Sequence, residues 1–320
     1  MKCGLVILNY KDYKTTQKLL DAVKDFPEID HIAVVDNDSQ NESYDVLKQY
    51  TCDKISVLRS GSNRGYSYGN NIGIRYLIKK FSPDIIGIAN PDVVFSNDYV
   101  KRIKELFTKN EDYAIITGLE TTSNGRVVFF FMDKEKEKAC TVFKQEIKSI
   151  FSFFPRILRK VSRKISHVKI KPLNKSQALY IDKELSKGTE LIQVWKVHGA
   201  MFFVRVSDFQ TIGLFDENIF MYREEEVLAF RIHSIHKKIG VAPDLKFVHL
   251  FIHYYSGNVH SIMPYFRRAL SYKNSKIYYF NHYVSGNKFL QAINWLLSWV
   301  NMLRECIESL IRFIINLFTH

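Results

Sequence analysis

Three consecutive acidic residues, Glu224, Glu225 and Glu226, precede a stretch whose pattern predicts a helix over residues 227–236. The positive end of a helix favours ionised carboxylates, and an ionised carboxylate can take a proton from a hydroxyl as a general base. Repulsion among three neighbouring carboxylates acts in the opposite direction. The run is therefore either the source of a catalytic base or an ordinary set of acidic residues at a helix start.

A second set of polar residues follows three predicted strands, at the point where each strand ends. The set comprises Asn9 and Tyr10, residues Asp36 to Ser39, and residues Asn90 to Asp92. Asn, Asp, Pro and Ser all favour turns, so each group by itself could serve only as a turn. In open parallel sheets, however, ligands bind beyond the carboxyl ends of the strands. Three such groups at consecutive strand ends therefore indicate a binding site.

The elements that must position these residues alternate along the first 120 residues. Apolar runs lie at 5–8, 32–35, 55–58 and 85–88, and helical patterns lie at 15–26, 44–49 and 70–81. This alternation predicts parallel β-α-β units, and hence an α/β fold with a doubly wound sheet that carries helices on both faces. A dinucleotide-binding fold is excluded, because no GxGxxG follows the first strand and the glycine-rich stretch at 61–69 follows the third; a P-loop is also absent.

The composition is that of an ordinary globular protein. The 320 residues are 46% hydrophobic and 25% charged, and 46 Lys and Arg against 33 Asp and Glu give a net charge of +13. The four cysteines form no Cys-x-x-Cys pair, which excludes a disulfide scaffold and is typical of a reducing cytosol. We expect no secretory signal, because Asn9 and Lys11 interrupt the first apolar run. We also expect no membrane span, because the longest uncharged run near the C-terminus, 289–303, has 15 residues where a span needs about 20.

Most of the excess positive charge lies in one segment. Residues 144–171 contain nine basic residues and one acidic residue, and the apolar residues Ile157, Val161, Ile165 and Val168 are spaced to share one helical face. Such a helix is typical of a protein that lies on an anionic membrane surface, although a solvated helix packed on the domain would show the same pattern. Nucleic acid is the least supported partner, and we expect none, since no nucleic-acid-binding motif accompanies the charge.

The C-terminal region shows a second amphipathic pattern, in which apolar residues recur at alternating spacings of four and three. They are Phe289, Ile293, Leu296, Val300, Leu303, Ile307, Leu310, Ile314 and Leu317. The pattern predicts one long helix, or two with a break. Trp295 and Trp299, one turn apart, suit a bilayer interface, whereas packing on the α/β domain or pairing with a second copy explains the pattern equally well.

As an ordered set, five sequence blocks resemble family 2 glycosyltransferases, in particular the bacterial rhamnosyltransferase-like branch with a GT-A fold. The blocks are VILNY at 6–10, VVDNDS at 34–39, NRGYSYGNNIG at 63–73, ANPDV at 89–93 and GLFDENIFMYREEE at 213–226. Each block is weak by itself, and their order and spacing make the resemblance specific. It covers roughly residues 4–119 and 194–256 and implies a GT-A-type doubly wound mixed sheet.

The resemblance implies transfer of a sugar from a nucleoside diphosphate donor to a hydroxyl, with inversion at the anomeric carbon. Asp36 would bind the nucleotide base or its ribose, because a carboxylate accepts hydrogen bonds from both a ring N–H and ribose hydroxyls. The other donor-side residues would be Asn9, Tyr10, Asn37, Ser39, Asn63, Gly65, Asn70, Asn90 and Asp92. The loop that runs from 63 to 73 would close over the nucleotide.

The resemblance also implies a divalent cation, Mg²⁺ or Mn²⁺, that bridges the two phosphates and stabilises the departing diphosphate. Asp92 matches the second aspartate of the family's Asp-x-Asp element, and Asn90 stands where the first would be. His249 matches the histidine that can complete the metal site. A structural histidine would fit this position almost as well, and His253 is a rival ligand nearby.

The resemblance implies that the catalytic base is one of the three glutamates at 224–226. Glu225 aligns with the residue that takes the proton from the acceptor hydroxyl, and Glu224 is the alternative. Val227 replaces a later aspartate of the family's motif, so the role of that aspartate is left without a polar group. Three further residues stand where the family approaches the donor sugar or the acceptor: Trp195, His198 and Gly199.

The expected organisation is a GT-A domain at 1–257, followed by a helical C-terminal region at 258–320 for which membrane contact is one interpretation. The domain would contain a nucleotide-sugar-binding half at 1–120, a basic amphipathic insert at 133–190 and an acceptor and base half at 191–257.

The expected function is extension of a glycan or polyprenyl-diphosphate-linked acceptor in bacterial surface polysaccharide synthesis, at the cytoplasmic face of the cell membrane. The C-terminal pattern leaves a homo-oligomer open. The departures at Asn90 and Val227 motivate a second hypothesis, a catalytically inactive relative that acts as a membrane-bound binding or assembly protein.

Overall fold

The computed structural model describes residues 1–128, 138–151, 173, 175–251 and 263–319. The chain divides into two units, the first comprising 1–135, 170–218 and 224–251 and the second comprising 136–169, 219–223 and 252–320. Segment 133–190, expected as a single insert, therefore contributes to both units. The predicted basic helix at 156–168 lies outside the described residues.

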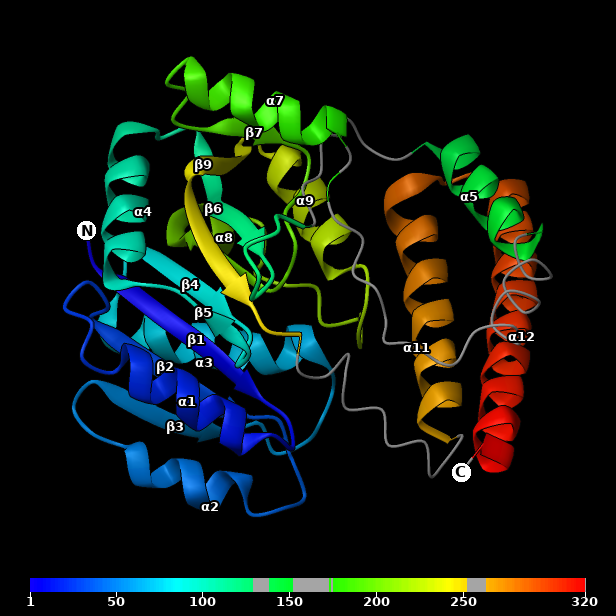
Figure 1. The fold of residues 1–320 in the computed structure, drawn as a ribbon, viewed down its shortest axis with the longest axis horizontal. Coiled ribbons are helices and arrows are strands. Elements are labelled where there is room, and N and C mark those ends of the chain that lie inside the picture. Colours follow the sequence, from blue (N-terminus) through cyan, green and yellow to red (C-terminus); the bar gives the residue numbers. More distant parts are fainter. Residues whose placement is uncertain (129–137, 152–172, 174, 252–262, 320) are drawn as a thin grey trace. The chain divides into compact units, whose positions relative to one another are not determined.

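The first unit is built on one mixed sheet, which Figure 1 shows at its centre. In the described residues the strand order is β3-β2-β1-β4-β8-β6-β9-β5, and β7 pairs with β9 off this path. The strands are β1 (Cys3–Asn9), β2 (His31–Asp36), β3 (Ile55–Arg59), β4 (Ile85–Ala89), β5 (Val93–Val94), β6 (Tyr113–Thr121), β7 (Ile192–Val194), β8 (Met201–Arg205) and β9 (Lys238–His249). Strands β1 to β4 are parallel, whereas β8 runs antiparallel to both β4 and β6. The predicted α/β fold with a mixed sheet is confirmed.

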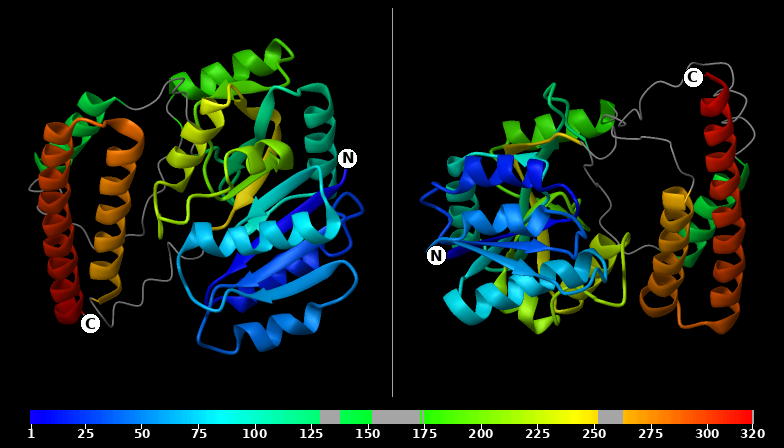
Figure 2. Two further views of the ribbon diagram at one scale, coloured as in Figure 1. Left: turned by 180° about the vertical axis from the view of Figure 1, so that it is seen from behind. Right: turned by 90° about the horizontal axis from the view of Figure 1, so that it is seen from below.

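Helices cover both faces of this sheet, as the opposite views in Figures 1 and 2 show. Alternate residues of β1 point to opposite faces, so Leu5 and Ile7 join one buried apolar cluster and Val6 joins the other. The first cluster is covered by α1 (Tyr13–Val23), α2 (Ser43–Leu47) and α4 (Asn97–Lys109), and the second by α3 (Tyr66–Phe81), α8 (Val206–Thr211) and α9 (Glu224–Ser234). A further helix, α7 (Lys175–Ser186), adds Ile181 to the second cluster, and a 3₁₀ turn (Lys48–Tyr50) follows α2.

Local capping fixes where several helices begin, and hence where the preceding loops lie. The side chain of Asp12 accepts a hydrogen bond from the Thr15 N–H at the start of α1, and that of Ser96 accepts from Tyr99 at the start of α4. Helix α3 begins after Gly65, whose φ of +102° is a conformation that favours glycine. The strand-to-helix loops that carry polar residues are therefore held at the carboxyl edge of the parallel strands.

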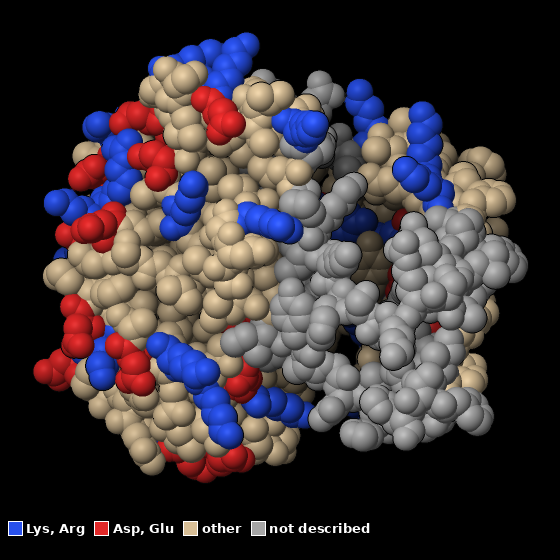
Figure 3. Space-filling model, in the orientation of Figure 1, with Lys and Arg blue, Asp and Glu red and all other residues tan. Residues whose placement is uncertain are grey.

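Charged side chains of the first unit are balanced locally. Arg102 contacts Glu105, Glu190 and Asp244 at 3.1 to 3.4 Å. On the face in Figure 3, basic and acidic side chains are interspersed along the edge, with uncharged residues between them. Such exposed pairs contribute little to stability, so they describe a mixed surface more than a stabilising network.

Apart from residues 219–223 and short connections, the described part of the second unit is helical. It contains α5 (Ala139–Phe151), α11 (Met263–Tyr279), a π-helical turn (Phe280–Val284) and α12 (Lys288–Thr319). The apolar pattern at 289–317 thus forms one unbroken helix of 32 residues, which confirms the predicted C-terminal amphipathic region. In the described ranges no helix has both the length and the apolar character that crossing a membrane demands.

Candidate active site

The ends of β1 and β2 bring three predicted donor-side residues together. The strand register pairs Asn9 with Asp36, and Asn9 Nδ2 donates to Asp36 Oδ1 at 2.8 Å. The Ser39 hydroxyl donates to the same oxygen at 2.5 Å, and the Ser39 N–H donates to Oδ2 at 3.2 Å. All three side chains are buried. A carboxylate is therefore held in a fixed orientation at the carboxyl edge of the sheet, and its contact with a nucleotide stays a prediction.

The next predicted group ties the glycine-rich loop to this edge. Asn37 Nδ2 donates to Asn63 Oδ1 at 3.2 Å and to the Gly65 carbonyl at 3.3 Å. Asn63 Oδ1 also accepts from the Gly65 N–H at 3.1 Å, which closes the loop on itself. A Cβ on Gly69 would come within 2.5 Å of Leu8, so glycine permits α3 to approach the sheet closely. The loop is thereby anchored beside Asp36.

Three other donor-side predictions have different surroundings. Tyr10 is exposed, with the Lys11 ammonium 5.1 Å from its ring centre. Asn70 is buried and its Nδ2 donates to the Tyr66 carbonyl at 3.0 Å, within helix α3. Asn90 follows β4, and its N–H donates to the Ala200 carbonyl at 2.8 Å. Direct contact of these three side chains with a donor stays a prediction.

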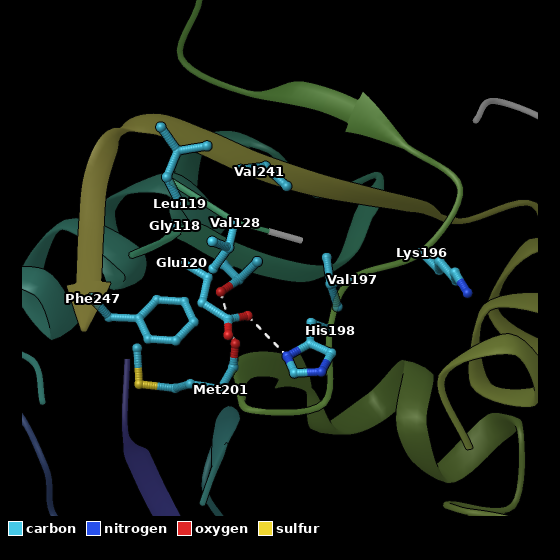
Figure 4. A pocket seen from close by; sticks show the side chains of 11 residues that line it. Gly118, Leu119, Glu120, Val128, Lys196, Val197, His198, Met201, Val241 and Phe247 are labelled. Carbon is cyan, nitrogen blue, oxygen red and sulfur yellow. Dashed lines mark hydrogen bonds and ion pairs between the residues drawn. The ribbon is translucent and has the colours of Figure 1, made fainter. Parts of the chain in front are cut away.

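Asp92 and His249 belong to a row of acidic and imidazole groups that we call the acid–imidazole chain. Its members are Asp92, His249, Glu120 and His198. His249 Nε2 lies 3.2 Å from Asp92 Oδ1, and its Nδ1 lies 2.7 Å from Oε1 of Glu120. The other oxygen of Glu120 lies 2.8 Å from Nδ1 of His198, a contact drawn in Figure 4. The pairing of β5 with β9 opposes Val93 to His249 and so brings Asp92 beside it. The rival His253 lies outside the described residues.

Burial and hydrogen bonding shift the pKa values of His249 and Glu120 within the acid–imidazole chain. Burial by itself would lower the pKa of His249, but its hydrogen bonds with Asp92 and Glu120 raise that pKa from 6.5 to about 9. Burial would raise the pKa of Glu120, but its hydrogen bonds with His198 and His249 hold it below the usual value. Glu120 is therefore an ionised acceptor between two imidazole N–H donors. Its contact holds the Nδ1–H of His249 and directs Nε2 towards Asp92, and Nε2 must lose its own proton before it can bind a cation.

The donor set around Asp92 fits a divalent cation. Two ligands bound at right angles to one ion at about 2.1 Å lie about 3 Å apart, and the carboxylate oxygen of Asp92 and Nε2 of His249 are separated by 3.2 Å. A buried carboxylate behind the ligating histidine, here Glu120, is the usual arrangement around protein-bound metals. A second group of residues could also hold an ion. Glu120, His198 and His249 each offer one ligand atom, and these three atoms lie within 4.8 Å of one another.

Glu225 is positioned by a backbone contact. Its Oε1 accepts a hydrogen bond from the Gly199 N–H at 3.1 Å, and a Cβ added to Gly199 would come within 2.7 Å of this oxygen. The Gly199 carbonyl accepts from the hydroxyl of Tyr66 at 3.0 Å, which holds the other side of the same residue. Because His198 contacts Glu120, the dipeptide His198–Gly199 links the acid–imidazole chain to Glu225.

Helix α9 begins earlier than the sequence pattern predicts. The predicted range was 227–236, whereas α9 starts at Glu224 and ends at Ser234, so all three glutamates lie in its first turn. Glu226 is buried and Lys196 Nζ lies 2.5 Å from its Oε1. Glu224 is also buried, and Glu225 is the half-buried member of the three. The lysine contact marks Glu226 as a structural partner and leaves Glu225 and Glu224 as the candidate bases.

Trp195 packs on α9. Its ring stacks on His233 with centroids 4.1 Å apart, and His233 Nε2 lies 2.9 Å from the Trp195 carbonyl oxygen. Trp195 is half-buried by this stack, so a contact with a sugar stays a prediction.

Two functional candidates, Glu120 and Lys196, are not among the residues predicted from the sequence. Glu120 lies within β6, one residue before its end, so the rule that places ligands beyond strand ends does not select it. Lys196 lies between the predicted residues Trp195 and His198, and its pairing with Glu226 carries no signal in the sequence.

Comparisons with known proteins identify the family of the chain. Residues 5–166, just over half of the chain, match the family described as Glycosyl transferase family 2. The low-salt glycan biosynthesis hexosyltransferase Agl10 of Haloferax volcanii is 25% identical over 249 residues, which cover 77% of this chain and 66% of Agl10. The rhamnosyltransferase WbbL of Escherichia coli is 24% identical over 258 residues, covering 78% of this chain and 83% of WbbL.

A solved structure shows the same fold. The mannosyltransferase PcManGT of Pyrobaculum calidifontis, in complex with GDP-Man and Mn²⁺, superposes with a TM-score of 0.54 at 12% identity, covering 97% of this chain and 74% of that one. The mixed sheet and the family match together confirm the predicted GT-A architecture. The chain belongs to glycosyl transferase family 2 and is a glycosyltransferase with a GT-A fold.

Proposed function

We propose that this enzyme transfers a sugar from a nucleoside diphosphate donor to an acceptor hydroxyl, with inversion at the anomeric carbon. The observation that carries the proposal is the dipeptide His198–Gly199, which contacts Glu120 of the acid–imidazole chain through one residue and Glu225 through the next. A group that stabilises a leaving diphosphate and a base that deprotonates an acceptor must act on opposite sides of one sugar carbon. Adjacent backbone positions are a direct way to couple the two.

The donor nucleotide is assigned to the pocket at the ends of β1 and β2. Asp36 would accept hydrogen bonds from the base or the ribose, and its fixed hydrogen bonds with Asn9 and Ser39 hold it in a single orientation. Orientation before binding lowers the entropic cost of recognition. A nucleotide sugar is also what PcManGT holds, as GDP-Man, in its complex.

Asp92 and His249 would hold a divalent cation, Mg²⁺ or Mn²⁺, which supplies charge stabilisation for the departing diphosphate. Glu120 is the positioning residue: it accepts from Nδ1 of His249 and so directs Nε2 towards Asp92. PcManGT contains Mn²⁺ in its complex, which supports a cation of this class here.

Glu225 would take the proton from the acceptor hydroxyl as that oxygen attacks the sugar carbon. The Gly199 N–H donates to its Oε1, which orients the carboxylate. Glu225 also lies in the first turn of α9, beside the positive end of the helix. Attack opposite the leaving diphosphate produces inversion.

The acceptor is proposed to be a glycan or a polyprenyl-diphosphate-linked glycan, in synthesis of a bacterial surface polysaccharide. Agl10 is named for glycan biosynthesis and WbbL as a rhamnosyltransferase, which supports an acceptor and a hexose donor of this kind. The basic segment at 144–171 supports work beside an anionic membrane surface, on its cytoplasmic face.

The test begins with thermal melting of the full chain against a panel of nucleotide sugars, each with Mn²⁺, with Mg²⁺ and with chelator. A donor should raise the melting temperature in a cation-dependent way, and that donor should then be hydrolysed or transferred in an activity assay. Binding without turnover across varied acceptors would instead favour the inactive relative that Asn90 and Val227 suggest. Neither binding nor turnover with any nucleotide sugar would contradict the proposal.

A further inference from the structure

Helix α12 presents a continuous apolar stripe to solvent. We call this stripe the seam and define it as Phe289, Ile293, Leu296, Val300, Leu303, Ile307, Leu310 and Ile314. Ile293 is half-buried, and the other seven are between 38% and 72% exposed. From Phe289 to Ile314 the seam runs about 38 Å along the helix at 1.5 Å per residue. An exposed apolar stripe of this length marks an interaction surface.

The opposite face of α12 is polar and is buried within the second unit, where part of it is hydrogen-bonded. Asn294, Ser298, Asn301, Arg304 and Glu308 are all buried. Asn301 Nδ2 donates to Glu146 Oε2 on α5 at 2.7 Å, and Lys276 of α11 pairs with the same carboxylate. Arg304 pairs with Glu308 at 2.6 Å. Helix α12 therefore packs on α5 and α11 through its polar side, and the seam is not used there.

The seam has the residue code of a two-stranded coiled coil. Its spacings alternate between four and three residues, which defines heptad positions a and d. Every a position is β-branched: Ile293, Val300, Ile307 and Ile314. The d positions are Phe289, Leu296, Leu303 and Leu310. β-Branched residues at a with leucine at d favour two parallel strands over three or four. We propose that two copies of this chain dimerise through the seams of their α12 helices, side by side and parallel.

A lipid surface is a poorer match for the same stripe. An interfacial helix on anionic lipid carries Lys and Arg along its polar face. Helix α12 has three basic residues in its 32, Lys288, Arg304 and Arg312, and the central one, Arg304, is buried against Glu308. A bilayer also has no means of distinguishing β-branched residues from leucine, whereas the a and d holes of a coiled coil do so through side-chain shape. We therefore propose membrane contact for the basic segment at 144–171 and not for the seam.

The parallel arrangement makes the interface isologous, so each seam residue faces its own copy across the two-fold axis. A dimer carries two active sites, and two sites on one particle can engage an acceptor that offers repeated sugars with higher avidity than one. This inference concerns assembly and stands whether or not the proposed reaction is correct.

The first test is the mass of the full chain in solution, by sedimentation and light scattering over a concentration series. Wild type should show twice the mass of the 37.6 kDa chain. Leu303→Glu with Ile307→Glu puts charge at the centre of the seam and should leave monomer. Trp295→Glu is the matched control, because Trp295 is 52% exposed on the same helix but is not part of the seam; it should remain a dimer. Circular dichroism and thermal melting check that each variant is folded.

A second variant keeps the apolar area of the seam and changes only which heptad positions carry β-branched side chains. Leucine at every a position and isoleucine at Leu296, Leu303 and Leu310 should move the assembly from two chains to three or four. A face covered by lipid or by the α/β unit of the same chain would not respond in this way. Monomeric wild type, a dimer that persists in the double glutamate variant, or an exchange variant that remains dimeric would overturn the proposal. If the wild type is monomeric and binds anionic phospholipid vesicles through the seam, the occupant of the seam is a lipid surface.

Discussion

The backbone N–H of Gly199 donates a hydrogen bond to Oε1 of Glu225 at 3.1 Å, and the same approach leaves no room for a side chain at position 199. The two residues come from different elements, a loop before β8 and the first turn of α9. Their contact orients a carboxylate that would otherwise rotate freely at a helix start. It also explains why glycine stands beside His198, which belongs to the acid–imidazole chain.

Glu225→Gln should abolish sugar transfer while donor binding stays near wild type. Glutamine preserves the size and the hydrogen bond from Gly199 but cannot accept a proton, so kcat should fall by about 10²- to 10⁴-fold, the usual contribution of a general base. Single-turnover rates and donor titrations by thermal shift separate the two effects. Glu224→Gln is the matched control from the same helical turn, and a larger loss in that variant would transfer the role to Glu224.

Gly199→Ala should reduce turnover without unfolding the protein. The added methyl would lie 2.7 Å from Oε1 of Glu225 and would displace that carboxylate. A displacement near 1 Å costs on the order of 10²-fold in rate. The measurement is kcat beside the melting temperature. Gly286→Ala serves as the control, since a Cβ there meets nothing within 4 Å. Unchanged kcat in Gly199→Ala would show that the base lies elsewhere.

Glu120→Gln should weaken cation binding more than it weakens the fold. Glu120 acts through His249, and loss of such an orienting carboxylate lowers metal affinity by about 10- to 100-fold. Calorimetric titration with Mn²⁺ alone measures this directly. Glu190→Gln removes an exposed carboxylate that pairs with Arg102 and Lys109 and should leave the affinity unchanged. If His198→Gln lowers the affinity as strongly as Asp92→Asn, then the ion is held by Glu120, His198 and His249 instead.

Stability should fall below neutral pH in part because of His31. This imidazole is buried, stacks on Phe81 with ring centres 3.5 Å apart, and lies 3.0 Å from the Ser56 hydroxyl. Burial holds its pKa below the ordinary 6.5, so the unfolded chain binds a proton more readily than the folded one. The contribution of His31 is complete above pH 6.5 and is lost as the pH falls below it.

Urea unfolding between pH 5 and 8 measures this effect in the wild type and in His31→Phe, which keeps the stack and removes the titrating group. The stability of the variant should depend less on pH across the acidic part of that range. His236→Asn changes an exposed histidine and should follow the wild type. Parallel curves for wild type and His31→Phe would contradict the assignment.

The sequence by itself determined the first half of the fold and the meeting of polar residues at one edge of the sheet. Short continuous apolar runs separated by helical patterns are local features, so strands β1 to β4 could be recognised without any tertiary contact. Parallel strands place their carboxyl ends at one edge, and this rule is enough to bring Asn9 and Asp36 together. The long C-terminal helix followed from its periodicity for the same reason.

Only the tertiary structure decided which groups complete the acid–imidazole chain. The pairing of β6 with β9 shifts register, so that Gly118 faces Ala242 but the next residue, Leu119, faces Lys246. A Cβ on Gly118 would come within 2.7 Å of the Leu245 carbonyl oxygen, which shows how closely the looped-out residues approach. This shift sets Glu120 opposite Phe247 and close to His249, 129 residues away in the chain. An irregularity of this kind has no period, so it becomes visible only when the two strands are side by side.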